Sequence, residues 1–443
     1  MYNATKRILL FFIISIPLCL NAQESSQELS LKDLVNKALQ NNQSIKSSVL
    51  DETIADKRVS EVKSNMLPQI NINGDYKYYS QMPLQLVPSS TLGGPENVYI
   101  PFEFGTPWNL STTISAGQLI YSQQYINGIK MANTGKDLSH FLVRKSKEDI
   151  VYNVSTLYYN AQIISANIGF IRSNIVNMEK LISTGELLFE NQMIKNTDVE
   201  KLKLNKTMLE TQENTINVTY DELINMLKFL SGFPQSDKLS ISKDISTKID
   251  IQPLRLSKPE RIEVKLLEKQ KELNELERKN LIAGYLPSLY AYGVYNYTFY
   301  GKGGGADLFK GYPASWFGLQ LSWNIFDGLG RKTKIDQKNV ENMKLDLQLN
   351  QINENISMEL SNAKNQINLQ ESNIQSRKDQ LSLAEKIYGQ VRQQFNEGLI
   401  NITEVLQSDN SLREAQNNYL VSLINLLNAQ LSWKKAAGKL LNY

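Results

Sequence analysis

The chain has almost no residues that bind transition metals or form disulfides. Among 443 residues there is one cysteine, Cys19, and one histidine, His140. Cys19 falls within residues 1–22, a basic and then apolar stretch with the pattern of a secretory signal peptide. A retained anchor helix is the alternative, but the apolar run is short for a bilayer. Removal of the peptide leaves no cysteine, which excludes disulfides and thiolate metal sites. His140 has no second histidine or cysteine with which to share a metal, so we expect no metal site and no cofactor.

An excess of charge of one sign is also missing. The 48 basic and 45 acidic residues nearly balance, at a net charge of +3, which argues against a nucleic-acid-binding surface. Beyond residue 22, no stretch approaches the ~20 consecutive apolar residues of a transmembrane helix. An exported chain of this kind is expected to be a soluble periplasmic or secreted protein, or a β-barrel of an outer membrane.

Motifs of catalysis are not found in the sequence. The segment GLGRKTK (residues 328–334) does not have the spacing of a phosphate loop, because Arg331 interrupts it. There is no nucleophile motif of the GxSxG kind, and the acidic residues show no paired spacing. We therefore expect no catalytic residue and no enzyme activity.

Proline is missing from two long stretches. None of the twelve prolines lies between Trp108 and Phe233, and none follows Pro313. Because proline breaks helix interiors, we expect long helices over residues 124–188 and 332–394, each roughly 95 Å long at ~1.5 Å per residue. The second carries an apolar stripe in steps of three and four, typical of a coiled coil: Leu345, Leu349, Ile352, Ile356, Leu360, Ala363, Ile367, Ile374, Leu381, Ala384, Ile387 and Val391.

The sequence contains the same order of segments twice. NMLPQINING (residues 65–74) corresponds to GYLPSLYAYG (284–293), and FENQMIKNTDV (189–199) corresponds to FNEGLINITEV (395–405). An internal repeat on this scale predicts two structural units of the same design.

The repeat divides the mature chain into three parts. We expect a first structural repeat over residues 23–234, a polar linker or equatorial segment over 235–258, and a second structural repeat over 259–443. In the first repeat, shorter helices over about 44–66 and 198–230 would stack end to end beside the long helix.

Between the helices, each repeat switches to a period of two. The expected strands cover residues 69–79, 108–121, 288–300 and 315–326, with Pro- and Gly-rich loops between them. Each is long enough to cross a bilayer, where ~9–11 tilted residues suffice. Four strands cannot close a membrane barrel, and open edges cannot lie in lipid, so we expect a trimer with twelve strands.

Aromatic residues gather in and beside these strands. Such residues form interfacial girdles in outer-membrane barrels, and the candidates are Tyr76, Tyr78, Trp108, Tyr121, Tyr295, Tyr297, Phe299, Trp316 and Trp323. The alternative is an ordinary amphipathic sheet with an aromatic face.

These features resemble the TolC-like outer-membrane efflux proteins, in order along nearly the whole mature chain. The matching segments are the opening LSLKDLVNKALQNNQSI, the Leu-Pro transitions into strands, the strand-to-helix segments QLIYSQQ and WNIFDGLG, and the paired turns. The resemblance implies an α+β membrane protein of long coiled-coil hairpins and four transmembrane strands per protomer. As a homotrimer it would form a 12-stranded β-barrel in the outer membrane of a Gram-negative bacterium and an α-helical barrel in the periplasm.

The resemblance also implies a function. Such proteins are passive exit ducts of tripartite efflux or type I secretion systems, opened by a periplasmic adaptor protein and an inner-membrane pump. The turns become helical hairpin tips, residues 189–197 and 395–403. The adaptor-contact residues carried over from the family are Gln192, Met193, Ile194, Gly398, Leu399 and Ile400.

A periplasmic gate is also implied, at Glu404, Gln407 and Asp198. Gln407 is neutral where the best-known family member has an acid. Three copies of Glu404 near one axis would resist full ionisation and attract cations. The alternative is that Glu404 and Asp198 only complement the dipole of a helix start.

The residue types at the two tips predict unequal geometry. Gly398 suits a left-handed position that ends a helix, whereas Gln192 does not, so the first tip is expected to depart from the second. Thr197 and Glu200 have the spacing of a capping box.

Two other classes of protein stay open at this point. A periplasmic coiled-coil adaptor would explain export and the hairpins, but not two pairs of bilayer-length aromatic strands. A structural or adhesive fibre would not need an internal duplication with matched helix lengths.

Overall fold

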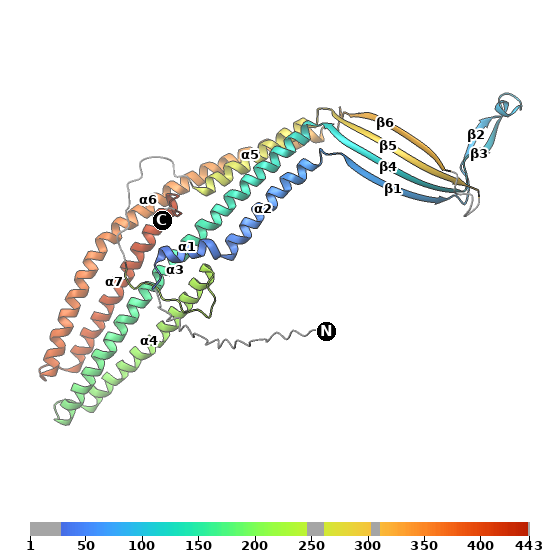
Figure 1. The fold of residues 1–443 in the computed structure, drawn as a ribbon. Helices are drawn as coiled ribbons and strands as arrows, with labels where there is room; N and C mark the ends of the chain where they lie inside the picture. The colour runs from blue at the N-terminus through green and yellow to red at the C-terminus, as the bar shows by residue number, and fades with distance from the viewer. Residues whose placement is uncertain (1–27, 246–260, 303–310, 442–443) are drawn as a thin grey trace, which may run out of the picture.

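Long helices and a small sheet lie end to end in this molecule (Figure 1). The computed structural model describes residues 28–245, 261–302 and 311–441; the expected signal peptide (1–22) and part of the expected linker (235–258) lie outside these ranges. The helices are α1 Leu31–Asn41, α2 Gln43–Ser64, α3 Gln123–Glu190, α4 Asn196–Ser231, α5 Ile262–Ala283, α6 Gly330–Asn396 and α7 Ile402–Ala436.

Each long helix is flanked by two shorter helices placed end to end. α3 packs against α2 and α4, and α6 packs against α5 and α7 (Figure 1). Because α3 also contacts α5 and α7, the helical columns follow one another in the order α2 with α4, α3, α5 with α7, and α6. At ~1.5 Å per residue, the 68 residues of α3 and the 67 residues of α6 each span roughly 100 Å.

Asn42 joins the two short helices of the first column. Its side-chain oxygen accepts hydrogen bonds from the backbone N–H groups of Ser44 (2.9 Å) and Ile45 (3.2 Å), which caps the start of α2. Its amide nitrogen donates to the carbonyl oxygen of Leu230 (2.8 Å), near the end of α4. One buried side chain therefore satisfies helix-end groups on both α2 and α4.

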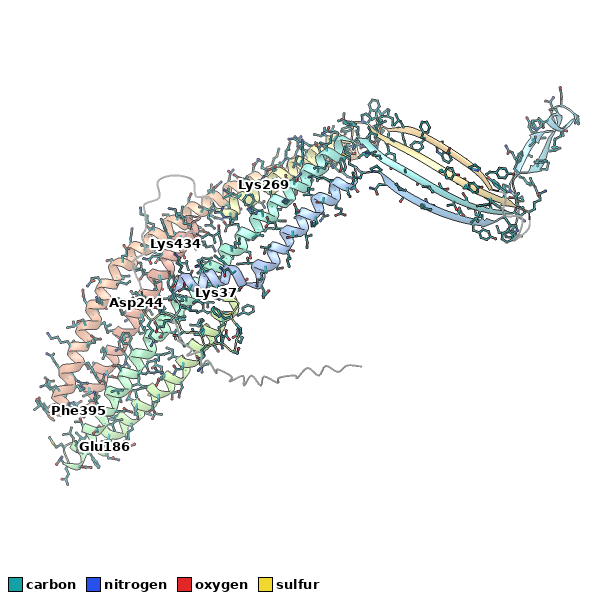
Figure 2. The ribbon with its side chains drawn as sticks, in the orientation of Figure 1. Lys37, Glu186, Asp244, Lys269, Phe395 and Lys434 are labelled. Carbon is teal, nitrogen blue, oxygen red and sulfur yellow. The ribbon has the colours of Figure 1, made fainter. Side chains whose placement is uncertain are left out.

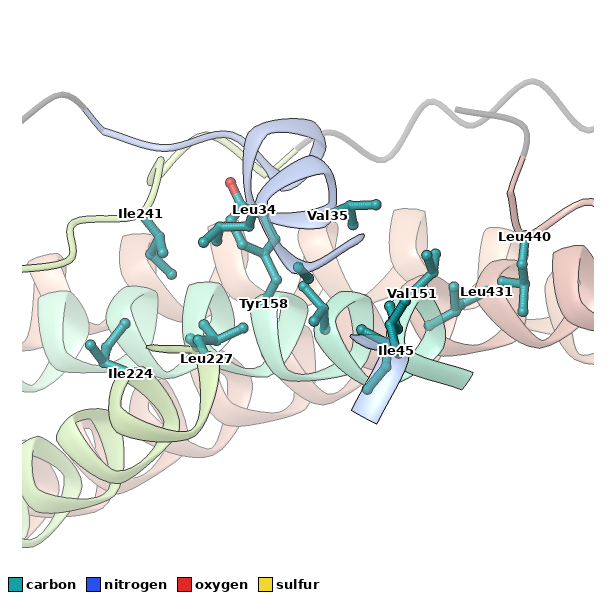
Figure 3. Packing of buried hydrophobic residues seen from close by; sticks show 14 residues of the cluster. Leu34, Val35, Ile45, Val151, Tyr158, Ile224, Leu227, Ile241, Leu431 and Leu440 are labelled. Atoms are coloured by element: carbon teal, nitrogen blue, oxygen red, sulfur yellow. The ribbon is translucent and has the colours of Figure 1, made fainter. Parts of the chain in front are cut away.

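Apolar clusters hold the columns together at two levels. The first cluster surrounds α1 near the middle of the molecule, and Leu34, Val151 and Leu227 are fully buried in it (Figure 3). Ile241 from the expected linker also packs into this cluster (Figure 3). The second cluster lies between the α3–α4 pair and the α6–α7 pair, toward the tips of the hairpins. The two hairpins are thus joined at mid-length and again near their tips.

The four long strands form one antiparallel sheet in the order β1, β4, β5, β6. Their bounds are β1 Gln69–Tyr78, β4 Trp108–Tyr121, β5 Ser288–Gly301 and β6 Gly311–Ser322. The fourth strand was expected to reach residue 326 but ends at Ser322, where the chain turns away. The indole N–H of Trp323 donates to the Tyr285 carbonyl oxygen (2.9 Å) and fixes that turn.

The register gives this sheet one apolar and one polar face. One row across the strands is apolar and consists of Ile70, Ala116, Gly293 and Phe317. A row whose side chains point to the other face of the sheet is polar and includes Asn73, Thr113 and Asn296. On the polar face the Asn296 amide donates to the hydroxyls of Ser111 (2.8 Å) and Thr113 (2.7 Å). The sheet is therefore amphipathic across its whole width.

The aromatic residues picked out from the sequence divide between the faces. Seven share the apolar face: Tyr76, Tyr78, Trp108, Tyr121, Tyr295, Tyr297 and Phe299. Trp316 pairs with Val294 on the polar face, and Trp323 lies beyond the end of β6. Trp108 packs against Tyr76 and Tyr78, with ring centroids 5.6 and 4.4 Å apart. Most of the aromatic set thus belongs to one continuous surface.

A second, small sheet interrupts the first long loop, for which the sequence analysis expected no strands. β2 (Leu84–Pro88) and β3 (Tyr99–Glu103) pair as an antiparallel hairpin, with the short helix η1 (Ser89–Leu92) between them. It lies beyond the end of the main sheet that faces away from the helices (Figure 1). Pairing gives the backbone groups of this loop internal hydrogen-bond partners.

Gly117 of β4 offers a test of the packing on the sheet. A Cβ placed on Gly117 would lie 2.0 Å from the Tyr290 hydroxyl oxygen, so Gly117→Ala must push the Tyr290 ring aside. We expect Gly117→Ala to destabilise the sheet by about 1–3 kcal/mol. Gly74→Ala on β1 is the matched control, because no atom lies within 4 Å of its added Cβ. Heat or urea resistance of the purified protein measures both; equal loss in the two variants would contradict the prediction.

Candidate functional site at the helical tips

The two hairpin tips have the same backbone geometry. In the first tip, Gln192 is left-handed (φ 60°), its N–H donates to Phe189 O, and the N–H of Met193 donates to Leu188 O (both 2.8 Å). This pair of bonds is the Schellman pattern that closes a helix end.

The second tip repeats the pattern residue for residue. Gly398 is left-handed (φ 72°), its N–H donates to Phe395 O, and the N–H of Leu399 donates to Gln394 O (both 2.9 Å). The prediction that Gln192 would give the first tip a different geometry is therefore wrong. The hydrogen bonds of the turn hold Gln192 in a conformation that costs a non-glycine residue roughly 1–2 kcal/mol.

An acidic side chain occupies the same place after each turn. α4 begins at Asn196, and the backbone N–H of Lys195 donates to Asp198 Oδ2 (3.4 Å). The predicted capping box of Thr197 and Glu200 is therefore wrong, because the helix begins before Thr197. Asp198 also pairs with Lys201 Nζ (3.1 Å).

Glu404 is the corresponding residue of α7. Asn401 caps this helix, since its side-chain oxygen accepts from the backbone N–H of Glu404 (3.2 Å). The amide nitrogen of Asn401 donates in turn to Glu404 Oε1 (3.4 Å). Both acids thus lie in the first turn of a helix, where a negative charge is favoured by the exposed N–H groups. Sequence reasoning missed Asn401, although asparagine is a preferred cap and its position before an apolar helix was readable.

A groove of about 370 Å³ lies between the two tips. Its apolar lining comes from Leu188, Met193, Ile194, Leu399, Ile400 and Ile402. Its polar lining comes from Lys195, Asp198, Asn401 and Glu404. The structure therefore brings together five of the six predicted contact residues and two of the three predicted gate residues.

The remaining predicted site residues lie elsewhere. Gln192 does not line the groove between the tips. Gln407 lines a neighbouring groove of about 560 Å³ along α6 and α7, which also contains Glu404, Glu414 and Arg377. Glu404 is the residue that the two grooves share.

The core under the tips is not symmetric. Phe395 at the end of α6 is fully buried, whereas Phe189 at the matching place on α3 is 43% exposed. Phe395 lies in the second apolar cluster with Leu188, Ile402 and Val405 (Figure 2). Phe395 thus anchors the α6–α7 tip in the apolar core, whereas the corresponding ring of the α3–α4 tip, Phe189, is partly exposed to solvent.

The described residues contain no group of three or more His, Cys, Asp or Glu side chains placed to hold a metal ion. His140 forms an exposed pair with Glu52 (Nδ1 to Oε1, 2.9 Å) that joins α3 to α2. Within the same described ranges, no helix is both long enough and apolar enough to cross a membrane.

The sequence is similar to known outer-membrane proteins. The family described as "Outer membrane efflux protein" matches residues 283–439, from the end of α5 through α7. "Outer membrane protein TolC" of Escherichia coli (strain K12) is 19% identical over 427 residues, which cover 94% of this chain and 83% of that protein.

The fold is similar to that of solved outer-membrane channels. The structure of CusC aligns with a TM-score of 0.76 and 15% identity over 92% of both chains. The open state of the Neisseria gonorrhoeae MtrE outer membrane channel aligns with a TM-score of 0.73 and 15% identity, over 92% of this chain and 88% of that one. The expected resemblance and the expected fold class of the protomer are thereby confirmed.

The left-handed positions of the tips generate opposite predictions. Gln192→Gly removes the strain of φ 60° and should stabilise the α3–α4 hairpin by about 1 kcal/mol. Gly398→Ala adds strain at φ 72° and places a Cβ 2.7 Å from Met193 Cε, so it should destabilise by a similar or larger amount. Thermal unfolding monitored by circular dichroism checks both signs. A loss of stability in Gln192→Gly would show that its side chain contributes more than the strain costs.

Proposed function

We propose that this chain, a TolC-like outer-membrane efflux protein, is the exit duct of a tripartite efflux or type I secretion system. The observation that carries the proposal is the direct junction of two parts in one chain. A sheet of bilayer length with one apolar face continues into helices of roughly 100 Å. Strands and helices in this arrangement form a continuous path from the outer membrane into the periplasm. No enzyme activity is needed for such a passive channel.

The sheet supports a place in the outer membrane. Its apolar face exposes Ile70, Ile72 and Phe317 by 69%, 68% and 92%, which suits contact with lipid. Its polar face would line the lumen, as in other membrane barrels. The outer edges of the sheet, on β1 and β6, have no strand partner among the described residues. Because lipid cannot satisfy an open edge, β1 would pair with β6 of the next copy.

The helical columns support closure by further copies of the same chain. α4 and α6 are the outer columns, and each has an apolar stripe on the side turned away from its partners. The exposed residues of these stripes include Leu204, Met208, Val218 and Phe229 on α4, and Val340, Met343, Leu347, Leu383 and Ile387 on α6. On each helix these residues lie on one face, with local spacings such as 204 to 208 on α4 and 340, 343 and 347 on α6, as in the seams of coiled coils. We infer a homotrimer in which α4 of one copy packs on α6 of the next.

The tips would form the periplasmic end of the duct. The apolar groove between them, lined by Met193, Ile194, Leu399 and Ile400, suits a periplasmic adaptor protein that links the duct to an inner-membrane pump. Glu404, exposed at the start of α7, would form a ring of three carboxylates near the threefold axis. Gln407 contributes no charge to this ring, and Asp198 is held by Lys201.

Assembly can be tested at the α4 seam. Met208→Lys places a charge in the proposed contact between copies and should convert trimer to monomer, with loss of pores in planar bilayers. Met208→Leu is the control, because it keeps an apolar side chain of similar volume at the same position and should leave the trimer intact. Size-exclusion chromatography with light scattering in detergent gives the oligomeric state. A stable wild-type monomer without conductance would overturn the proposed function.

The gate role of Glu404 makes a separate prediction. Glu404→Gln keeps the size of the side chain but removes its charge, so cation over anion permeability should fall several-fold if the carboxylates ring the entrance. Reversal potentials under a salt gradient measure this ratio. Unchanged selectivity, together with a lower melting temperature, would leave Glu404 with only its role at the helix start.

A further inference from the structure

A carboxylate is buried in the seam between α6 and α7, above the tips. Asp409 of α7 is 1% exposed and lies at the level of the second apolar cluster. Its charged neighbour is Arg413, one turn further along α7, with Nε 3.0 Å from Asp409 Oδ2. The Arg413 side chain is 24% exposed and also donates to Asn410 Oδ1, so it remains partly solvated. The Asp409 carboxylate, in contrast, is shielded from solvent.

Tyr388 faces this region from α6 and is also buried, at 4% exposure. Neither the Tyr388 hydroxyl nor Asp409 Oδ2 has a well-aligned hydrogen-bond partner among the described residues. Burial raises the pKa of Asp409 above its usual range, and the nearby Arg413 only partly offsets this. Burial and the charge of Asp409 raise the pKa of Tyr388 to about 12. The ionised form of Asp409 is therefore the costly one in this packing.

The same level of the molecule carries the polar links between the two helical hairpins. Arg392 Nη1 of α6 donates to Asn177 Oδ1 of α3 (3.0 Å). Asn174 Nδ2 of α3 donates to Gln416 Oε1 of α7 (2.9 Å), and both residues are buried. Arg413 of α7 thus acts on Asp409, while Asp409, Arg392 and Arg413 all act on Tyr388 of α6. The α3 side chains bonded to α6 and α7 here are the neutral amides of Asn177 and Asn174. At this level, both α6 and α7 are therefore hydrogen-bonded to α3.

We propose that Asp409 is a pH-sensitive lock of the entrance, which rests on the proposed function. When Asp409 is ionised, its buried charge disfavours close packing of α7 on α6 and on the α3–α4 hairpin. When it is protonated, the penalty of the buried charge disappears. The tightly packed seam is then favoured, and the tips are held closed.

The direction of the pH effect follows from linkage. An acid whose pKa is higher in the folded state than in the unfolded state adds stability as the pH falls through the folded pKa. The packed seam should therefore be most stable under acidic conditions and weaker near neutral pH. Channels should accordingly conduct less on acidification of the periplasmic side.

Asp409→Asn tests the lock, because asparagine imitates the protonated acid. We expect wild-type conductance to fall several-fold as the periplasmic side is acidified through the folded-state pKa of Asp409, which burial raises above its usual range. Asp409→Asn should show the low conductance at every pH. Glu414→Gln is the matched control, since Glu414 is an exposed acid on the same helix and its loss should leave the wild-type pH response. A wild-type pH response in Asp409→Asn overturns the lock.

If no pores form, the proposed duct is contradicted. The lock at Asp409 can still be tested by a second measurement. The melting temperature of Asp409→Asn should exceed that of the wild type by roughly 2 °C or more near neutral pH. The difference should shrink as the wild type becomes protonated. A difference that is absent, or that does not depend on pH, overturns the lock whatever the protein conducts.

Discussion

A β-strand edge cannot end in hydrocarbon, and this constraint decides how the rest of the chain is used. Each unpaired backbone group in lipid costs several kcal/mol, and β1 and β6 each have such an edge. The outer helical columns have a parallel need, because apolar stripes on α4 and α6 face away from every helix they contact. In the proposed trimer, the rotation that would pair β6 with β1 of the next copy would also bring α6 toward α4 of that copy. The sheet and the ring of helices would then close together, through the same contacts between copies.

The acids at the tips show how one side chain serves the local fold and the larger assembly together. Asp198 and Glu404 occupy equivalent places in the first turns of α4 and α7, where backbone N–H groups stabilise their charge. The side-chain amide of Asn401 also donates to the Glu404 carboxylate (3.4 Å). In the proposed duct, a charge placed at a helix start would present a defined field to the entrance. The helix-start role and the gate role are therefore compatible.

Much of this fold follows from the sequence, because its signals are long. Proline-free stretches, a sustained apolar stripe and a repeated plan give the helices to within a few residues. The errors occur where backbone hydrogen bonds outweigh residue preference. Gln192 is left-handed because two turn hydrogen bonds hold it there, and the side-chain pattern does not reveal them. The start of α4 differs from the predicted capping box because Lys195 supplies the N–H that Asp198 accepts.

Asp409 illustrates a different reason for a missed site. Along α7 it stands among Ser408, Asn410 and Ser411, so it reads as one more solvated residue of a polar helix face. Only the phase of α7 against α6 shows that this position points inward. A phase error of one residue exchanges a buried acid for an exposed one, and sequence periodicity in a helix rich in Asn, Gln and Ser does not determine the phase that closely.

The equal geometry of the two tips has a consequence for symmetry. In a trimer, six tips with the same backbone alternate around the axis, so the shape of the entrance approaches sixfold symmetry. The side chains break that symmetry to threefold, with Gln192 and an exposed Phe189 on one kind of tip, and Gly398 and a buried Phe395 on the other. A partner that recognises only the backbone shape encounters six equivalent sites. A partner that recognises side chains encounters two different kinds of site, three of each kind, and its subunits can bind the two kinds with different strength.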